Sequence, residues 1–463
     1  MPHFNPVSNE VLAQLTAVLT PDQISTTEAD RQQHAQDMSQ HAPRLSEVVV
    51  WPTNSQQVAD VLQIAHRHRI PVTPWGAGSS LEGNPIPLFG GITLSLARMN
   101  QIVALHADDF QVTVQPGLGY KDLNQQLGPH GLFFAPDPGA NASIGGMLAN
   151  NAAGSRTVKY GATKDNVLAM EVVLADGRIL QTGSRSVKQS AGYDMLHLFV
   201  GSEGTLGVIT QATLRLAPVS AIMSSAVATF ADVETAVAAV VELRASGLDI
   251  AALEFIDAAT SGLLSREEDV DWGENPTLLM EIHAAHAETA ELDLALIQET
   301  CRAHGAGRFV ATTDAAERQK MWQTRHHMFE TLRRVFVGHR WQLADVAVPI
   351  SQFPALVKFA RQTLQERNLP ELMVGHAGDG NLHIAIPYAD EATRQGANLA
   401  NEEVVLQAIA LGGTATGEHG VGIGKAKFMV REHGETAVEI MRHLKQTLDP
   451  HDILNPGKII PQP

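Results

Sequence analysis

PWGAGSSLEG, residues 74–83, follows a strand-like run and gathers glycine and serine at the point where that strand ends. Glycines at 76, 78 and 83 carry no side chain, so backbone N–H groups and two serine hydroxyls can approach a pyrophosphate closely. The run differs from the dinucleotide fingerprint of a doubly wound fold in the position of its third glycine, and no Gly-Lys-Ser/Thr follows as in a P-loop. Taken alone, such a run is more often an ordinary turn than a ligand site.

Two further runs of small residues share this composition. They are PDPGANASIGGMLANNAAGSRTVKYG at 136–161 and VGSEGTLGVIT at 200–210. Small residues suit a backbone that passes close to a large flat ligand, and Ser143, Asn150 and Asn151 can donate hydrogen bonds to it. Long irregular loops inside compact domains are usually functional. Three such runs together predict a bound nucleotide cofactor.

Composition limits the class of protein. The chain has 463 residues, of which 44% are hydrophobic, so it is long enough and apolar enough to form two or three domains. Its 33 basic and 50 acidic residues give a net charge of -17. That balance argues against nucleic acid or an anionic membrane as the main partner. A single cysteine, Cys301, excludes a disulfide framework or a four-thiolate cluster within the chain. With no signal-like start and no apolar run of roughly 18 residues, we expect a soluble, cytoplasmic protein, with peripheral membrane association at most.

The pattern predicts three regions: a helical lead-in over 1–45, a first domain over 46–218 and a second over 219–463. Pro218 and the small residues after it mark the boundary between the two domains. The first domain opens with a strand–helix–strand unit, and Asp176-Gly177 predicts a hairpin. The second shows the β-α-β-β-α-β order of a ferredoxin-like layer, on which helices near 315–335, 351–367, 390–411 and 435–447 are expected to pack. The predicted class is α+β.

A candidate metal site lies in GHAGDGNLHIAIP, residues 375–387. Asp-Gly turn chemistry between two strand-like runs predicts a hairpin that brings His376 and His383 together. TGEHGVG adds Glu418 and His419, and two imidazoles with one carboxylate suit zinc or a similar divalent ion. Since the chain has 20 histidines, spacing alone leaves open a solvated or hydrogen-bonded pair.

These runs resemble the FAD-binding domain of the vanillyl-alcohol-oxidase-type, or p-cresol methylhydroxylase (PCMH), flavoproteins. The motifs ADVAVPIS, GHAGDGNLH, GTATGEHGVGIGK and LDPHDILNPGKII are similar to the family that groups FAD-dependent D-lactate dehydrogenases of the cytochrome type, glycolate oxidases and D-2-hydroxyglutarate dehydrogenases. The resemblance implies a PCMH-type domain of two α/β subdomains and an FAD-linked oxidase C-terminal domain carrying substrate, metal and cap. It also implies noncovalent FAD, because the pyrophosphate loop has no histidine or cysteine.

The resemblance also implies roles for individual residues. His376, His383 and Glu418 match the ligands of a divalent metal, expected to be zinc or manganese, while His419 matches a base and Arg325 a substrate-binding arginine. The implied FAD-binding residues are Pro74, Gly76, Ala77, Gly78, Ser79, Ser80, Pro138, Ser143, Gly145, Gly146, Asn150, Ala153, Gly154, Tyr160, Gly161, Glu203, Gly204, Ile209 and Asn455.

The expected activity is oxidation of a small D-2-hydroxy acid, D-lactate first, with electrons passing to an external quinone, cytochrome or electron-transfer flavoprotein. Leu343 stands near the place where the 2-hydroxyglutarate branch carries a lysine, which favours a small or apolar acid over a dicarboxylate. Glycolate or D-2-hydroxyglutarate oxidation, a metal-free phenolic alcohol oxidase, a zinc hydrolase and an inactive flavin-binding subunit remain alternatives. The oligomeric state is left open, with a homodimer as one alternative.

Overall fold

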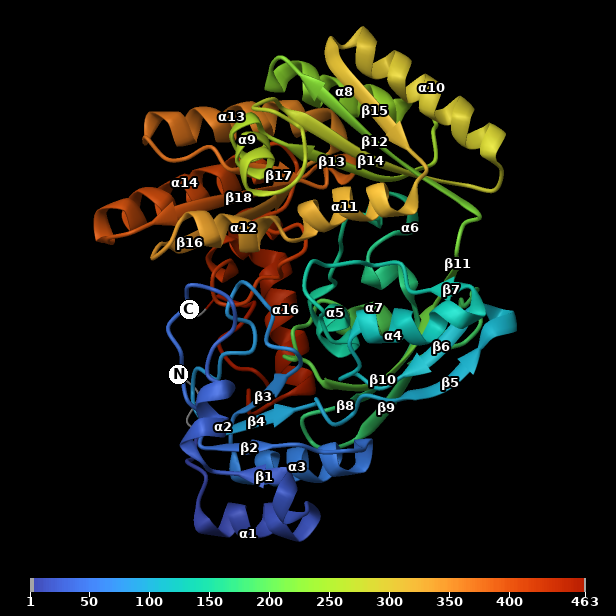
Figure 1. The fold of residues 1–463 in the computed structure, drawn as a ribbon. Helices are drawn as coiled ribbons and strands as arrows, with labels where there is room; N and C mark the ends of the chain where they lie inside the picture. The colour runs from blue at the N-terminus through green and yellow to red at the C-terminus, as the bar shows by residue number, and fades with distance from the viewer. Residues whose placement is uncertain (1–3, 462–463) are drawn as a thin grey trace. The chain divides into compact units, whose positions relative to one another are not determined.

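The structure is a computed structural model that describes residues 4–461, and it divides into two compact units (Figure 1). Unit 1 contains the chain through Ala153, the stretch Ala162–Val219 and everything from Glu418 onward. Unit 2 contains Gly154–Gly161 and Ser220–Gly417. Each unit is therefore assembled from segments that are separated in the sequence.

The first sheet of unit 1 has four strands in the order β1-β2-β4-β3. Its strands are β1 (Ile24–Ser25), β2 (Val48–Val50), β3 (Val72–Trp75) and β4 (Ile92–Ser95). The predicted strand–helix–strand unit is confirmed: α3 (Ser55–His68) joins β2 to β3, and the Asn54 side chain caps it by accepting the Gln57 N–H at 3.0 Å. β4 runs parallel to both and lies between them.

The second sheet of unit 1 has five antiparallel strands in the order β5-β6-β10-β8-β9. These are β5 (Ile102–His106), β6 (Gln111–Val114), β8 (Val167–Val173), β9 (Ile179–Gly183) and β10 (Val208–Arg215). The predicted hairpin at Asp176-Gly177 joins β8 to β9, with Gly177 at a φ of 84° that favours glycine. β7 (Leu132–Phe133) and β11 (Ala217–Pro218) form a separate short pair.

Unit 1 contains helices from the start, the middle and the end of the chain. They are α1 (Asn9–Val18), α2 (Glu28–Gln33), α3, α4 (Tyr120–Leu127), α5 (Ile144–Asn150), α7 (Met195–Phe199), α15 (Met429–His433) and α16 (Glu435–Leu448). Residues 435–447 were expected to pack on the ferredoxin-like layer, yet α16 belongs to unit 1. Its buried Lys445 explains this, since Nζ donates to the carbonyls of Thr205 at 2.9 Å and Leu454 at 2.7 Å.

Unit 2 is built on a seven-stranded sheet in the order β15-β12-β14-β13-β17-β18-β16. The predicted ferredoxin-like order is confirmed over β12 (Ile222–Phe230), α8 (Val233–Ala245), β13 (Ile250–Ile256), β14 (Thr277–Ala284), α10 (Ala287–Ala303) and β15 (Ala306–Thr312). β17 (Met373–Gly375), β18 (Asn381–Tyr388) and β16 (Arg340–Ala347) extend the layer beyond β13 through antiparallel pairs.

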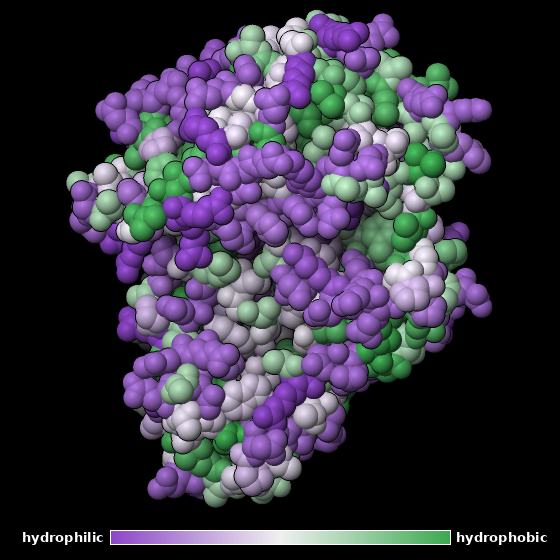
Figure 2. Space-filling view, viewed as in Figure 1, coloured by the Kyte–Doolittle hydropathy of each residue, from purple (hydrophilic) through white to green (hydrophobic). Residues whose placement is uncertain are grey.

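The remaining helices of unit 2 are α6 (Thr157–Tyr160), α9 (Ala258–Glu267), α11 (Ala315–His326), α12 (Met328–Val335), α13 (Phe353–Glu366) and α14 (Glu391–Ala410). The helix expected over 315–335 is divided at His327 into α11 and α12. Trp322 and Leu332 of these helices pack into a buried cluster with strand residues such as Val374. Their outer surface is mostly hydrophilic (Figure 2).

Short 3-10 turns connect several elements: η1 (Pro21–Gln23), η2 (Ala107–Asp109), η3 (Gly128–His130), η4 (Thr163–Asn166), η5 (Ile350–Gln352), η6 (Ala377–Asp379) and η7 (Ala426–Phe428). The predicted α+β class is confirmed, because both units combine helices with largely antiparallel sheets. Among residues 4–461, no helix combines the length and apolar character needed to cross a bilayer.

Candidate functional site

The three glycine-rich runs meet within unit 1. A side chain on Gly76, just after β3, would clash with the hydroxyl of Ser143 at the start of α5. A Cβ on Gly204 would lie 2.9 Å from Cγ of Pro74. The backbones of all three runs therefore approach one another at distances that only small residues allow.

This arrangement leaves backbone donors available to an anion. The Ser143 side chain caps α5 by accepting the Gly146 N–H at 3.3 Å. Within residues 4–461, the N–H groups of residues 77–80 donate no hydrogen bond to another residue. The glycine backbone, the serine hydroxyls and these N–H groups together form a cradle. Such a cradle fits the pyrophosphate of a dinucleotide.

Most of the residues predicted to bind FAD lie in unit 1, but three do not. Gly154, Tyr160 and Gly161 belong to unit 2, where the Tyr160 hydroxyl is 2.7 Å from Nδ1 of His283. In unit 1, Asn455 Nδ2 donates to the carbonyl of Glu203 at 2.7 Å. The members of the predicted set in unit 1 are Pro74, Gly76, Ala77, Gly78, Ser79, Ser80, Pro138, Ser143, Gly145, Gly146, Asn150, Ala153, Glu203, Gly204, Ile209 and Asn455.

The hairpin of β17 and β18 brings the two predicted ligand histidines of unit 2 together. His376 follows β17, and His383 of β18 pairs with Val374 across the sheet. The two ring centroids lie 5.2 Å apart with the planes at 86°, and a nitrogen of each ring lies within 4.8 Å of the other. Two ring nitrogens at that separation can share one cation.

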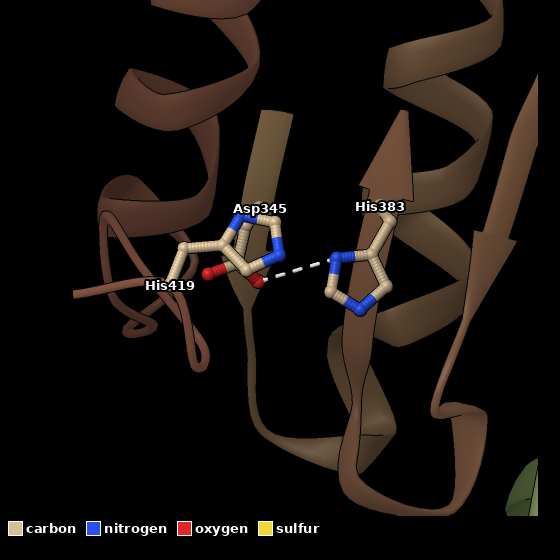
Figure 3. Close-up of side chains that lie close together, drawn as sticks. All are labelled: Asp345, His383 and His419. Carbon is tan, nitrogen blue, oxygen red and sulfur yellow. Dashed lines mark ion pairs between the residues drawn. The ribbon is translucent and has the colours of Figure 1, made fainter. Parts of the chain in front are cut away.

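A buried carboxylate stands behind each imidazole. Glu254 Oε1 on β13 is 2.7 Å from Nδ1 of His376. Asp345 Oδ1 on β16 forms an ion pair at 3.5 Å with Nδ1 of His383, as Figure 3 shows. Both carboxylates are fully buried. A carboxylate at Nδ1 fixes the ring orientation and favours the tautomer whose Nε2 can bind a metal.

Electrostatics keep Glu254 ionised. Burial alone would raise its pKa, but the charges of His376 and Arg325 outweigh burial and hold the pKa at about 2. Arg325, on α11, is itself buried and places its guanidinium 2.6 Å from Oε2 of Glu254. The predicted substrate-binding arginine therefore uses one nitrogen on Glu254, which fixes the direction of the rest of its fork.

Glu418 and His419 open the last segment of unit 1, directly after Gly417 of unit 2. The Thr416 hydroxyl donates to Asp345 Oδ2 at 2.8 Å, and a Cβ on Gly417 would lie 2.9 Å from Asp345 Oδ1. Unit 2 therefore ends with Thr416 and Gly417 held against Asp345, and Glu418 is the next residue of the chain.

Sequence reasoning did not identify Glu254 and Asp345. Each is an acidic residue inside an otherwise apolar strand run, ALEFI and LADVA, and an acidic residue in a buried strand requires a partner. A second trio of the same kind is centred on β14, where the buried carboxylate of Glu281 pairs with His283 of the same strand at 2.7 Å and with Arg156, which precedes α6, at 3.0 Å.

Comparisons with known proteins cover both units. Residues 46–183 match the FAD binding domain family, and residues 221–459 match the family of FAD linked oxidases, C-terminal domain. The chain is 39% identical to a probable mitochondrial D-lactate dehydrogenase of Danio rerio, over 97% of this chain and 91% of the relative. It is 35% identical to the mitochondrial D-lactate dehydrogenase (cytochrome) of Arabidopsis thaliana, over 99% of this chain and 81% of that one. Identity to glycolate oxidase subunit GlcD of Bacillus subtilis is 34%, over 98% and 97%.

Solved structures share the fold. p-Cresol methylhydroxylase with substrate bound superposes with a TM-score of 0.80 at 17% identity, covering 98% of this chain and 97% of that one. 4-Ethylphenol oxidase from Gulosibacter chungangensis gives a TM-score of 0.80 at 18% identity, covering 100% and 99%. The predicted PCMH-type fold is confirmed.

One expectation is overturned by the relatives. The chain was expected to be cytoplasmic, but the relatives from Danio rerio, Arabidopsis thaliana, Saccharomyces cerevisiae and Kluyveromyces lactis are named as mitochondrial proteins. Composition carries little physical trace of a protein's compartment, so it was a poor basis for that expectation.

Proposed function

Because the chain belongs to the FAD-linked oxidases of the D-lactate dehydrogenase family, we propose that it oxidises a small D-2-hydroxy acid to the 2-oxo acid, with D-lactate as the expected substrate. The observation that carries the proposal is the pair of imidazoles, each backed by a buried carboxylate, on β17–β18. Such a pair is costly to bury and is typical of a metal site.

FAD, when bound noncovalently in unit 1, supplies the hydride acceptor. The residues proposed to hold its pyrophosphate are the backbone of 76–80 and Ser143. No histidine or cysteine occurs in residues 74–83 to form a covalent bond to the flavin.

His376, His383 and Glu418 are the proposed ligands of a zinc or manganese ion. The donor set of two neutral imidazoles and one carboxylate fits either metal and leaves coordination positions for substrate. Such an ion would act as a Lewis acid that lowers the pKa of the substrate hydroxyl.

The protein's own groups orient the acid and move its proton. Arg325, held by Glu254, is proposed to grip the substrate carboxylate through the remainder of its fork. His419 is proposed to accept the hydroxyl proton while the α-carbon loses hydride, so one proton and one hydride leave the alcohol together. The product is the 2-oxo acid.

The strand positions beside the histidine pair are apolar, and we propose that they favour a substrate with an apolar substituent. On one face of the sheet, Leu343 precedes Asp345 by two residues and pairs with Ala385, which follows His383 by two. Trp341 lies two residues before Leu343 on β16 and contacts Phe336 edge-on. This run supplies no cation for a second carboxylate, so D-2-hydroxyglutarate is a weaker candidate than D-lactate, and glycolate stays a second candidate through the GlcD relative.

Reduced flavin requires an external acceptor, proposed to be a quinone, a cytochrome or an electron-transfer flavoprotein. The D-lactate dehydrogenases of Arabidopsis thaliana and Saccharomyces cerevisiae are named for cytochrome. The single cysteine cannot hold a four-thiolate cluster within this chain.

Anaerobic flavin reduction tests the proposal. Purified holoprotein is mixed with D-lactate, L-lactate, glycolate or D-2-hydroxyglutarate, and flavin absorbance is followed. Bleaching is expected with D-lactate, with little response to L-lactate. If no D-2-hydroxy acid bleaches the flavin, the proposed activity is refuted.

The metal is tested separately. His383→Ala should retain bound FAD and lose about 100-fold or more in the rate of reduction by D-lactate, since a missing ligand removes the ion. Wild-type rates after verified metal removal would refute the ligand assignment while leaving the dehydrogenase assignment intact.

A further inference from the structure

Both carboxylate oxygens of Glu203 are occupied by protein donors. Oε1 accepts the N–H of Val421 at 2.6 Å and Oε2 accepts the N–H of Gly422 at 2.9 Å, all within unit 1. The side chain is buried. The family resemblance implies that Glu203 binds FAD. Two charge-assisted hydrogen bonds to one backbone segment indicate a different role.

The backbone of Glu203 is fixed as firmly as its side chain. Its N–H donates to the carbonyl of Ala149 at 2.8 Å, and its carbonyl accepts Asn455 Nδ2 at 2.7 Å. Its φ of 50° lies in the left-handed region, which a side chain other than glycine adopts at a cost. The surrounding contacts offset that cost, so the direction of the carboxylate is set by the fold.

The segment that Glu203 holds is also held from its other sides. Asn150 Nδ2 donates to the carbonyl of His419 at 3.3 Å, and the N–H of Ile423 donates to the carbonyl of Glu82 at 2.8 Å. A Cβ on Gly420 would lie 2.9 Å from Glu203 Oε1, so glycine permits the close approach. All of these bonds use backbone atoms of residues 419–423, none of them the side chains of Glu418 or His419.

From this geometry we infer that Glu203 is a positioning residue that fixes the backbone of residues 419–422 and thereby sets where Glu418 and His419 are presented. The inference rests on the proposed roles of Glu418 as metal ligand and His419 as base. It assigns Glu203 no contact with the flavin. Glutamine at this position would face one backbone N–H with its own NH2, and the lost acceptor would loosen the segment.

The test compares Glu203→Gln and Glu203→Asp with the wild-type holoprotein. Glu171→Gln is the matched control, since Glu171 on β8 also accepts hydrogen bonds, from Thr210 at 2.8 Å and Gln181 at 2.7 Å, but contacts no residue of 418–423. Four quantities are measured: FAD per chain, amide hydrogen exchange of the 418–423 peptide, zinc affinity by chelator competition, and the rate of anaerobic flavin reduction by D-lactate.

Glu203→Gln is expected to keep wild-type FAD content, to exchange the 418–423 amides about 10-fold faster, and to lose about 10- to 100-fold in zinc affinity and reduction rate, because a hydrogen bond to a charged group is lost. Glu203→Asp keeps two acceptors and should recover part of each loss. Glu171→Gln should stay within about two-fold of wild type, as its hydrogen bonds lie elsewhere.

Wild-type exchange and zinc affinity in Glu203→Gln would overturn the inference. So would a loss of FAD that accounts for the loss of activity, because Glu203 would then bind the flavin. If Glu203→Gln does not fold, Glu203→Asp decides: faster exchange with bound FAD supports the inference and unchanged exchange overturns it. If no D-2-hydroxy acid reduces the wild type, the proposed function fails while exchange and zinc affinity still test Glu203.

Discussion

Glu254 shows how one carboxylate can hold two basic side chains. It is the central member of a chain that runs from Arg325 through its carboxylate to His376, with distances of 2.6 Å and 2.7 Å. Removing one partner from such a buried set leaves an unpaired charge, which costs far more than the set contributes as a whole. Its two oxygens therefore couple the proposed substrate arginine to a proposed metal ligand.

Glu254→Gln should weaken both ends of this chain. We expect zinc affinity to fall about 10- to 100-fold, since His376 loses its carboxylate, and stability to fall by about 3 kcal/mol, since Arg325 loses its counter-charge. Chelator competition and urea unfolding measure the two effects.

Glu281→Gln is the matched control for that variant. Glu281 is likewise buried on the same sheet and paired with a histidine and an arginine, and those two charges and hydrogen bonds overcome burial to hold its pKa at about 2. The control should lose stability while keeping wild-type zinc affinity. Equal losses of zinc affinity in both variants would contradict a specific role for Glu254.

At the scale of the element, α9 begins at a carboxyl group with an unusual pKa. Asp257 Oδ1 caps the helix by accepting the Thr260 N–H at 2.9 Å, and burial raises the pKa of this carboxyl to about 7. The folded protein thus binds a proton between pH ~4 and ~7 that the unfolded chain releases. By linkage, the free energy of unfolding falls as pH rises through that window and is level above it.

Asp257→Asn should remove this part of the pH dependence, because asparagine keeps the capping oxygen and cannot ionise. The difference in unfolding free energy between the variant and the wild type should therefore shift in favour of the variant by about 2.5 kcal/mol from pH 5 to pH 8. Urea unfolding at both pH values measures the change. Asp232→Asn on α8 is the control: Asp232 caps its helix at 2.8 Å in solvent, and hydrogen bonds from Thr235 lower its pKa. A parallel change in both variants would contradict the prediction.

Elements were predictable from the sequence where the signal is local. The Asp-Gly turn chemistry at 176–177 and 379–380 predicts both hairpins, and the alternation of strand and helix predicts the ferredoxin-like order. The partners of Glu254 could not be predicted in this way, because His376 lies 122 residues away in the chain. Nor does any local pattern assign α16 to unit 1, since Lys445 is buried there by contacts with Thr205.

At the scale of the molecule, charge bears on the electron acceptor. A net charge of -17 raises the local concentration of cationic proteins and repels anionic ones. A basic carrier protein should therefore meet the reduced enzyme faster than a neutral dye of similar potential.

Steady-state turnover with D-lactate should show this difference. With cytochrome c as a cationic probe, the rate should fall several-fold as ionic strength rises from about 0.01 M to 0.15 M, since the Debye length shortens from about 30 Å to 8 Å. With a neutral quinone the rate should change little. Equal salt dependence for the two acceptors would contradict electrostatic steering.

The divided sequence of unit 1 has a consequence for biosynthesis. The outer edge of strand β3 forms hydrogen bonds only with the end of the chain. There the Val72 N–H donates to the Ile453 carbonyl at 2.7 Å, and the Asn455 N–H donates to the Val72 carbonyl at 2.8 Å. A ribosome adding about 5–20 residues per second needs roughly 10–40 s to make the intervening unit 2. Throughout that interval the nascent flavin domain exposes an unpaired strand edge. Premature termination near residue 450 would make that exposure permanent, so a loss of few residues should yield an aggregating product.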